Sequence, residues 1–238
     1  MSIATTTEPT ARQRMLSGEM PFLLRRLHSL TGIFFGGFVM AHLLANATLI
    51  EGFREGDFTK TVYQKQVDTI HHLPFLTIAE WTLIYLPILY HTVYGLWLTY
   101  TAQPNVNLYP YSKNVFYVFQ RLSALVLTAF IFFHITSLKG WYGSGMRFTP
   151  SQATETVITH LNISWFIGWF VYPLGILAAC YHLANGFWTA AISWGVTISA
   201  GAQRRWGWAC VLLFLFTFSC GMMALVGGLT SAAMAQHH

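Results

Sequence analysis

The 238-residue sequence predicts an all-α membrane protein with five transmembrane helices. Hydrophobic residues make up 54% of the chain and charged residues only 9%. A water-soluble domain carries about 25% charged residues, so this chain cannot cover a solvent-facing surface. Aromatic residues reach 16%, which fits the belts of Trp and Tyr at membrane interfaces.

Five apolar segments are long enough to cross a bilayer, which takes about 20 helical residues. They are residues 22–50, 75–101, 115–138, 163–192 and 206–234. We expect kinks at Pro87 and Pro173, inside the second and fourth segments, because proline removes a backbone N–H from a helix. The chain thus divides into a cytoplasmic N-terminal segment (1–21), a transmembrane domain (22–234) and a tail (235–238).

The longest polar stretch, residues 51–74, separates the first two segments and predicts a short amphipathic helix around residues 63–70. Of the 13 Lys and Arg residues, eight fall on the N-terminal side of the membrane and five on the other. Because cytoplasmic loops are enriched in these residues, the N-terminus is predicted to lie in the cytoplasm and the protein in the cell's inner membrane. The net charge of +5 forms no long basic run, so lipid rather than nucleic acid is the expected partner.

Four of the ten histidines lie well inside apolar segments, one on each of the first four segments. They are His42, His91, His134 and His182. A single intramembrane histidine is most often a hydrogen-bonded residue of the bundle interior. Four of them on four helices point to a common site.

Depth sorts these histidines into two pairs. At the helical rise, His42 and His134 lie about 30 Å and about 28 Å from the cytoplasmic ends of their helices. His91 and His182, on helices that run the other way, lie about 15 Å from that side. The first two form an outer pair and the last two an inner pair.

Two cross-helix pairs fit haem iron better than zinc or a proton relay. Zinc takes three or four ligands at one level, and a relay strings polar groups along one path. Haem iron takes an imidazole on each face of its ring. The predicted fold therefore has four helices bundled around two stacked haems.

Three stretches of the sequence carry a family resemblance, which extends through SWGVTIS (193–199). They are RRLHSLTG (25–32), LPILYHTVYG (86–95) and YHLANGFW (181–188). Together they resemble the di-haem cytochrome b subunits of succinate:quinone oxidoreductases and quinol:fumarate reductases. The resemblance covers nearly the whole chain.

The resemblance implies two b haems with the four histidines as axial ligands, His91 with His182 for the inner haem and His42 with His134 for the outer one. It implies a membrane anchor of succinate dehydrogenase (quinone) or fumarate reductase (quinol). The partners would be a flavoprotein subunit with covalent FAD, which performs the dicarboxylate chemistry, and an iron–sulfur subunit. It also suggests menaquinone as the quinone. Cys180 stands where some fumarate reductases of this family carry a proton-transferring Glu, which removes the ionisable group from that route.

Helix geometry adds candidates for binding the haem propionates at the cytoplasmic rim. Fourteen residues make nearly four turns, so His28 shares a face with His42, and Gln120 shares one with His134. The predicted contacts are His28, Ser29, Gln120 and Arg121.

Glu80 is the one carboxylate inside an apolar segment, and we predict that it belongs to a quinone site. On an ideal helix, the eleven residues between it and His91 place it on the same face, about 16 Å outward. The same site is predicted to include residues of the preceding loop: Tyr63, Asp68, His71 and His72.

Two other functions fit the intramembrane histidines. A hydrogenase or formate dehydrogenase cytochrome b subunit also uses such ligands, although its histidine spacing matches less well. A non-haem membrane transporter would place the histidines along its path. Succinate oxidation and fumarate reduction use the same parts, so the sequence leaves the direction of catalysis open.

Overall fold

The computed structural model is all-helical, with turns and short irregular connections, over the residues that it describes, namely 19–51, 58, 60–102 and 106–235. Among these residues, four helices are long and apolar enough to cross a membrane, and a fifth span is reached if one bent helix pair counts as a span. The predicted class, a multi-pass all-α membrane protein, is confirmed. Residues 1–18 of the predicted N-terminal segment and 236–238 of the tail lie outside the described residues.

The five predicted segments correspond to long helical stretches in the expected order. In chain order they are α2 (Glu19–Ala47); α5 (Leu76–Glu80), η1 (Trp81–Tyr85) and α6 (Leu86–Tyr100); α7 (Ser112–Leu138); η4 (Ile167–Val171) and α9 (Tyr172–Ser193); and α10 (Ala200–Ala235). The last helix begins before the predicted residue 206, because the polar residues Gln203 and Arg204 continue the helix beyond its apolar part. The stretch Leu76–Tyr100 is long and apolar enough for a membrane span only when it is taken together with the preceding helix, residues 62–71.

Both intramembrane prolines follow a π turn. The turns η1 and η4 each end two residues before a proline, Pro87 and Pro173 respectively. At the end of each turn a backbone N–H bonds five residues back, from Leu86 to the Trp81 carbonyl and from Tyr172 to the Ile167 carbonyl. Proline lacks an N–H and crowds the carbonyl four residues earlier, and the wider turn accommodates both effects.

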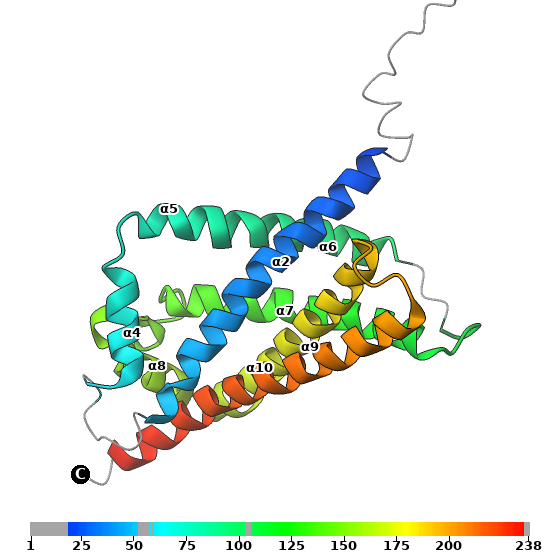
Figure 1. The fold of residues 1–238 in the computed structure, drawn as a ribbon. Helices are drawn as coiled ribbons and strands as arrows, with labels where there is room; N and C mark the ends of the chain where they lie inside the picture. The colour runs from blue at the N-terminus through cyan, green and yellow to red at the C-terminus, as the bar shows by residue number, and fades with distance from the viewer. Residues whose placement is uncertain (1–18, 52–57, 59, 103–105, 236–238) are drawn as a thin grey trace, which may run out of the picture.

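Two short helices close one end of the bundle, where α2 and α10 finish (Figure 1). They are α4 (Val62–His71), which confirms the predicted amphipathic helix, and α8 (Ala153–Asn162). The Thr61 hydroxyl caps α4 by accepting the Gln64 N–H at 3.1 Å. The same hydroxyl lies 2.8 Å from that of Thr154 on α8, and the Gln64 side chain accepts the Thr154 N–H. The two helices are thus fastened by buried hydrogen bonds.

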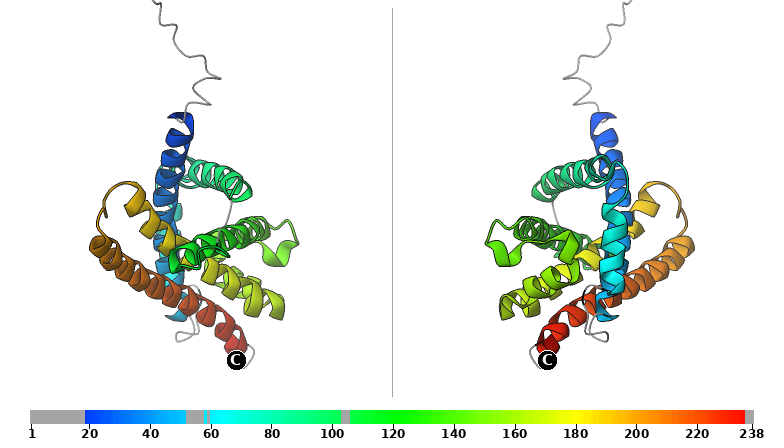
Figure 2. Two further views of the ribbon diagram at one scale, coloured as in Figure 1. Left: turned by 90° about the vertical axis from the view of Figure 1, so that its right-hand side faces the viewer. Right: turned by 90° about the vertical axis from the view of Figure 1, so that its left-hand side faces the viewer.

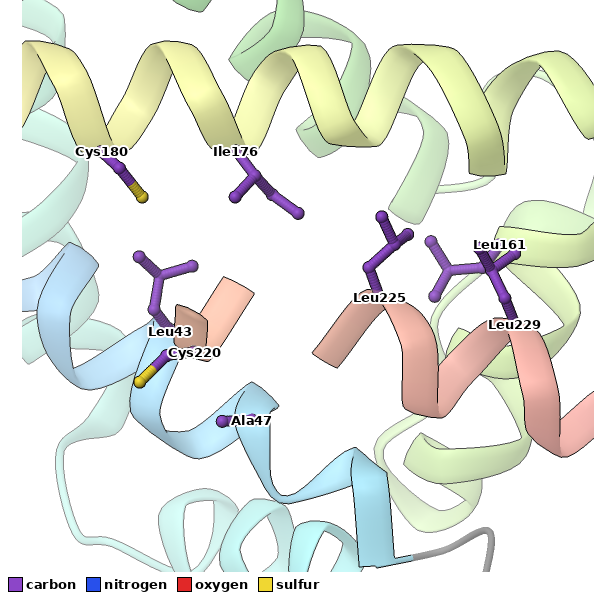
Figure 3. Packing of buried hydrophobic residues seen from close by; sticks show 8 residues of the cluster. All are labelled: Leu43, Ala47, Leu161, Ile176, Cys180, Cys220, Leu225 and Leu229. Carbon is purple, nitrogen blue, oxygen red and sulfur yellow. The ribbon is translucent and has the colours of Figure 1, made fainter. Parts of the chain in front are cut away.

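The hydrophobic core lies where α2, α8, α9 and α10 meet (Figure 3). Its buried members are Leu43, Ala47, Leu161, Ile176, Cys180, Cys220, Leu225 and Leu229. Helix α10 packs along both α2 and α9, α7 packs along α9, and α6 packs along α2. Figure 2 shows α6 beside the upper part of α2 and α10 crossing its lower part, and neither α6 nor α7 contributes a member to this cluster. The core therefore fills one side of the bundle.

A close approach of α10 to backbone in this region depends on Gly227. A Cβ at this position would lie 2.6 Å from the Ile50 backbone nitrogen, at the end of the first span. Gly227→Ala should push α10 away from that backbone and lower the free energy of unfolding by about 1–3 kcal/mol, as overpacking does. Thermal unfolding of the detergent-solubilised protein, followed by circular dichroism, measures this loss.

The matched control is Gly37→Ala on α2, where an added Cβ meets no atom within 4 Å. This variant should unfold at the wild-type temperature or slightly above it, since Ala favours helix over Gly. Equal melting temperatures for the two variants would show that the close contact at Gly227 is not required.

Candidate functional site

A cavity of about 1260 Å³ runs through the bundle between the histidine-bearing helices, and core residues such as Leu43 and Ile176 form part of its wall. It exceeds the roughly 300–1,000 Å³ of a pocket for one small ligand. Its lining includes all four intramembrane histidines and most other predicted site residues: His42, His91, His134, His182, His28, Ser29, Gln120, Arg121, Tyr63 and Glu80. Helices α2, α6, α7 and α9 contribute one intramembrane histidine each.

The structure brings these four histidines together in two pairs. The ring centroids of His42 and His134 are 6.0 Å apart, with the ring planes at 80°. Those of His91 and His182 are 6.1 Å apart, with the planes at 87°. These are the two pairs that helix depth predicted.

Both separations fit one metal ion held between two imidazoles. Each metal–nitrogen bond is about 2 Å long. When the distance from nitrogen to ring centroid is added on both sides of the ion, the two centroids lie about 6 Å apart. Within the described part of the chain, no group of three or more His, Cys, Asp or Glu side chains gathers that could hold an ion. A zinc site made wholly of protein ligands is therefore not formed there.

Hydrogen bonds set the tautomers of the inner pair. The Nδ1 atom of His91 lies 3.0 Å from the backbone carbonyl of His28, and that of His182 lies 3.2 Å from the carbonyl of Gln120. A carbonyl only accepts, so each Nδ1 carries the proton and donates it. The lone pair of each ring is then on Nε2, the arrangement found in metal-binding histidines.

The outer ligand candidate His134 is held through two further side chains. Its Nδ1 lies 3.2 Å from the Tyr172 hydroxyl, which lies 2.8 Å from Nε2 of His160. Nδ1 of His160 in turn lies 3.2 Å from the Met146 carbonyl. Burial lowers the pKa of His160, which keeps that ring neutral at pH 7.

Sequence reasoning missed both His160 and Tyr172. His160 lies just outside the fourth apolar segment, on α8, and its side chain is 1% exposed. The available signal was a histidine near the end of a short amphipathic stretch beside the membrane. Tyr172 is one of eleven tyrosines, and nothing local to it indicates a histidine partner.

The four residues predicted to bind haem propionates differ in whether their polar atoms already have hydrogen-bond partners in the protein. The His28 ring stacks on His91, with centroids 4.0 Å apart. Its Nδ1 atom, and Nε of Arg121, are buried with no hydrogen-bond partner in the described part of the chain. Both residues line the cavity with other parts of their side chains, while His91 stacks on His28 and the Tyr117 ring lies against Arg121.

Gln120 and Ser29 already have partners within the protein. The Gln120 amide donates to the His182 carbonyl and accepts from Asn185, which ties α7 to α9. The Ser29 hydroxyl accepts the indole N–H of Trp194 at 2.9 Å. Both residues line the cavity and also hold its walls together.

The predicted quinone residues are separated by the structure. Glu80 is partly buried at the end of α5, and Tyr63 on α4 is 6% exposed, and both line the cavity. Asp68, His71 and His72 are exposed residues at the other end of α4, outside the cavity lining. The ring nitrogens of the two histidines lie close to backbone carbonyls of the same helix.

Comparison with known proteins identifies a homologue of this chain. No protein-family model matches this sequence. The chain is 28% identical to the succinate dehydrogenase cytochrome b558 subunit of Bacillus subtilis over 213 residues, which is 88% of this chain and 98% of that protein. An alignment that spans nearly all of both chains relates them over the whole bundle, not over one helix. The chain is therefore a homologue of that cytochrome b558 subunit over nearly its whole length.

Proposed function

We propose that this protein carries electrons between an iron–sulfur subunit and membrane quinone through two bis-histidine b haems. The inner haem is held by His91 and His182, and the outer haem by His42 and His134. The observation that carries the proposal is the pair of histidine ring separations, 6.1 Å and 6.0 Å, within one cavity. Haem supplies one-electron chemistry at each level when it is bound.

The surroundings of the histidines support this assignment. His91, His182 and His134 each commit Nδ1 to a partner inside the protein, which leaves Nε2 for iron. The cavity is large enough for more than one small ligand.

The inner end of the cavity suits haem propionates. His28 and Arg121 both line the cavity, and the Arg121 guanidinium is a cationic donor. Charge-assisted hydrogen bonds from such groups to carboxylates are stronger than neutral ones. Ser29 and Gln120 shape the same wall, so all four predicted residues keep a role in this proposal.

We infer that the protein works as one subunit of a larger membrane enzyme. The homologue is named as a succinate dehydrogenase subunit. By analogy, the partners of this chain are a flavoprotein subunit with FAD, where succinate is oxidised, and an iron–sulfur subunit. The Lys and Arg bias places the N-terminus and these partners on the cytoplasmic side of the inner membrane. Menaquinone is the proposed electron acceptor.

We place the quinone at the outer end of the cavity, near Glu80 and Tyr63. Reduction of a quinone to a quinol takes up two electrons and two protons. The outer haem would supply the electrons when bound, and the Glu80 carboxyl group passes protons between quinone and the aqueous phase. His71 is exposed beside this region and remains a predicted contributor with weaker support.

Replacing a ligand should remove the haem of its own pair, because each iron loses one axial nitrogen. His91→Ala or His182→Ala should remove the inner haem, and His42→Ala or His134→Ala the outer one. The ratio of haem to protein in the purified complex, with its reduced optical spectrum, measures the loss. His72→Ala, an exposed histidine outside the cavity, serves as the control and should keep two haems. A His91→Ala complex with two haems and an unchanged spectrum would show that the ligand assignment is wrong.

Glu80→Gln should separate quinone chemistry from electron entry, since it keeps the side-chain shape and removes the ionisable proton. Quinone-linked turnover should fall by about 10²–10⁴-fold, the usual contribution of a positioned proton-transfer group. Haem content and succinate oxidation with a soluble dye should stay at the wild-type level. Glu155→Gln, at an exposed carboxylate of α8 outside the cavity lining, is the matched control. Normal quinone turnover by Glu80→Gln at every pH tested would exclude Glu80 from the site.

A further inference from the structure

We propose that Tyr172 and His160 are positioning residues that orient His134 and strengthen its bond to the outer haem iron. The inference rests on the proposed function, in which His134 is a ligand of that haem. It concerns a hydrogen-bonded chain of three side chains from α7, α9 and α8 that ends on a backbone carbonyl. The inner pair has no such hydrogen-bonded chain, because its histidines donate directly to backbone carbonyls.

The Met146 carbonyl sets the direction of every bond in the chain. Because it only accepts, Nδ1 of His160 must carry a proton and donate it. Nε2 of the neutral His160 ring is then an acceptor, so the Tyr172 hydroxyl donates to it. That hydroxyl has no second proton, and its oxygen accepts from Nδ1 of His134. His134 is left with its lone pair on Nε2, which is the tautomer that binds iron.

Packing holds the members of the chain in place. The ring of Phe130 stacks on His134, with centroids 5.7 Å apart at 22°, and meets the Tyr172 ring edge-on at 5.5 Å. His160 is 1% exposed and lies against Phe133. Met146 is also buried, in the short helix η2 (Ser144–Met146). The His160–Met146 end of the hydrogen-bonded chain is therefore shielded from the outer solvent.

The hydrogen-bonded chain should affect the midpoint potential of the outer haem. A hydroxyl that donates a hydrogen bond becomes a better acceptor, so His160 polarises Tyr172 toward His134. An acceptor at Nδ1 raises the basicity of a ligating imidazole. A more basic ligand favours ferric over ferrous iron. The chain should therefore lower the midpoint potential of the outer haem and leave that of the inner haem unchanged.

Tyr172→Phe tests this directly, because it removes the hydroxyl and keeps the ring that packs on Phe130. The outer haem should remain bound, and its preference for ferric iron should fall about tenfold, which is about 59 mV upward for a one-electron couple. A redox titration of the purified complex, with the low-spin ferric signals of both haems read by electron paramagnetic resonance, measures the shift. The inner haem should keep its potential and its signal.

Tyr142→Phe is the matched control at the same end of the bundle. The Tyr142 hydroxyl accepts from Thr136 and touches none of the four proposed ligands. Its loss should move neither potential. A shift in Tyr142→Phe as large as in Tyr172→Phe would overturn the proposal, because the effect would then belong to any lost hydroxyl.

His160→Gln gives an independent test. It should raise the potential of the outer haem alone, and the double variant with Tyr172→Phe should match Tyr172→Phe, because one broken link already disconnects His160. Additive shifts, or an unchanged outer haem in both single variants, would overturn the proposal. If Tyr172→Phe loses both haems, the single variant His160→Gln decides the question by the same shift. A wild-type complex without haem would instead overturn the proposed function.

Discussion

The arrangement of the site depends on one constraint: an imidazole buried in a bilayer must satisfy its ring nitrogens without water. A polar group left unpaired there costs several kcal/mol. In this protein His91, His182 and His134 meet the constraint at Nδ1 with partners on neighbouring helices. Once Nδ1 is committed, the other nitrogen has to find its partner in the cavity. The pairing of rings across helices follows from that requirement.

The cavity exists because the packing of the bundle is lopsided. The buried apolar cluster joins α2 and α9 to α10, the long helix that carries no histidine (Figure 3). Helices α6 and α7 stand on the far side, each fastened mainly to one of the histidine-bearing helices of that core, α6 to α2 and α7 to α9. Since α10 holds α2 and α9 together, the four histidine-bearing helices can surround a hollow space and still be stably associated. We regard α10 as the structural support for the site.

The two ends of the cavity differ in chemistry. Around the inner pair the lining includes the basic side chains of His28 and Arg121 and the Gln120 amide, beside hydroxyl groups such as that of Ser29. Around the outer pair they are a carboxyl, two phenols and a further imidazole, from Glu80, Tyr63, Tyr172 and His160. Groups of the first kind stabilise negative charge, and groups of the second kind can exchange protons at moderate cost. This polarity suits an electron path whose quinone end needs protons.

The structure also corrects one step of the geometric reasoning about Glu80. An ideal helix places it on the face of His91, but the π turn η1 lies between the two. The extra residue changes their relative rotation by about 100°. Glu80 nevertheless lines the cavity.

Hydropathy and the helical rise act on a helix whatever its neighbours are. The sequence by itself therefore determined the all-α class, the order of the apolar segments and the depth of His42, His91, His134 and His182, which was enough to pair them. Contacts between distant segments depend on how the helices rotate and pack. Only the tertiary structure decided that His160 reaches Tyr172, that His71 is exposed and that Arg121 lines the cavity. The physical reason is that the depth of a residue in the membrane follows from its position along its own helix. The direction of its side chain depends on every helix packed against it.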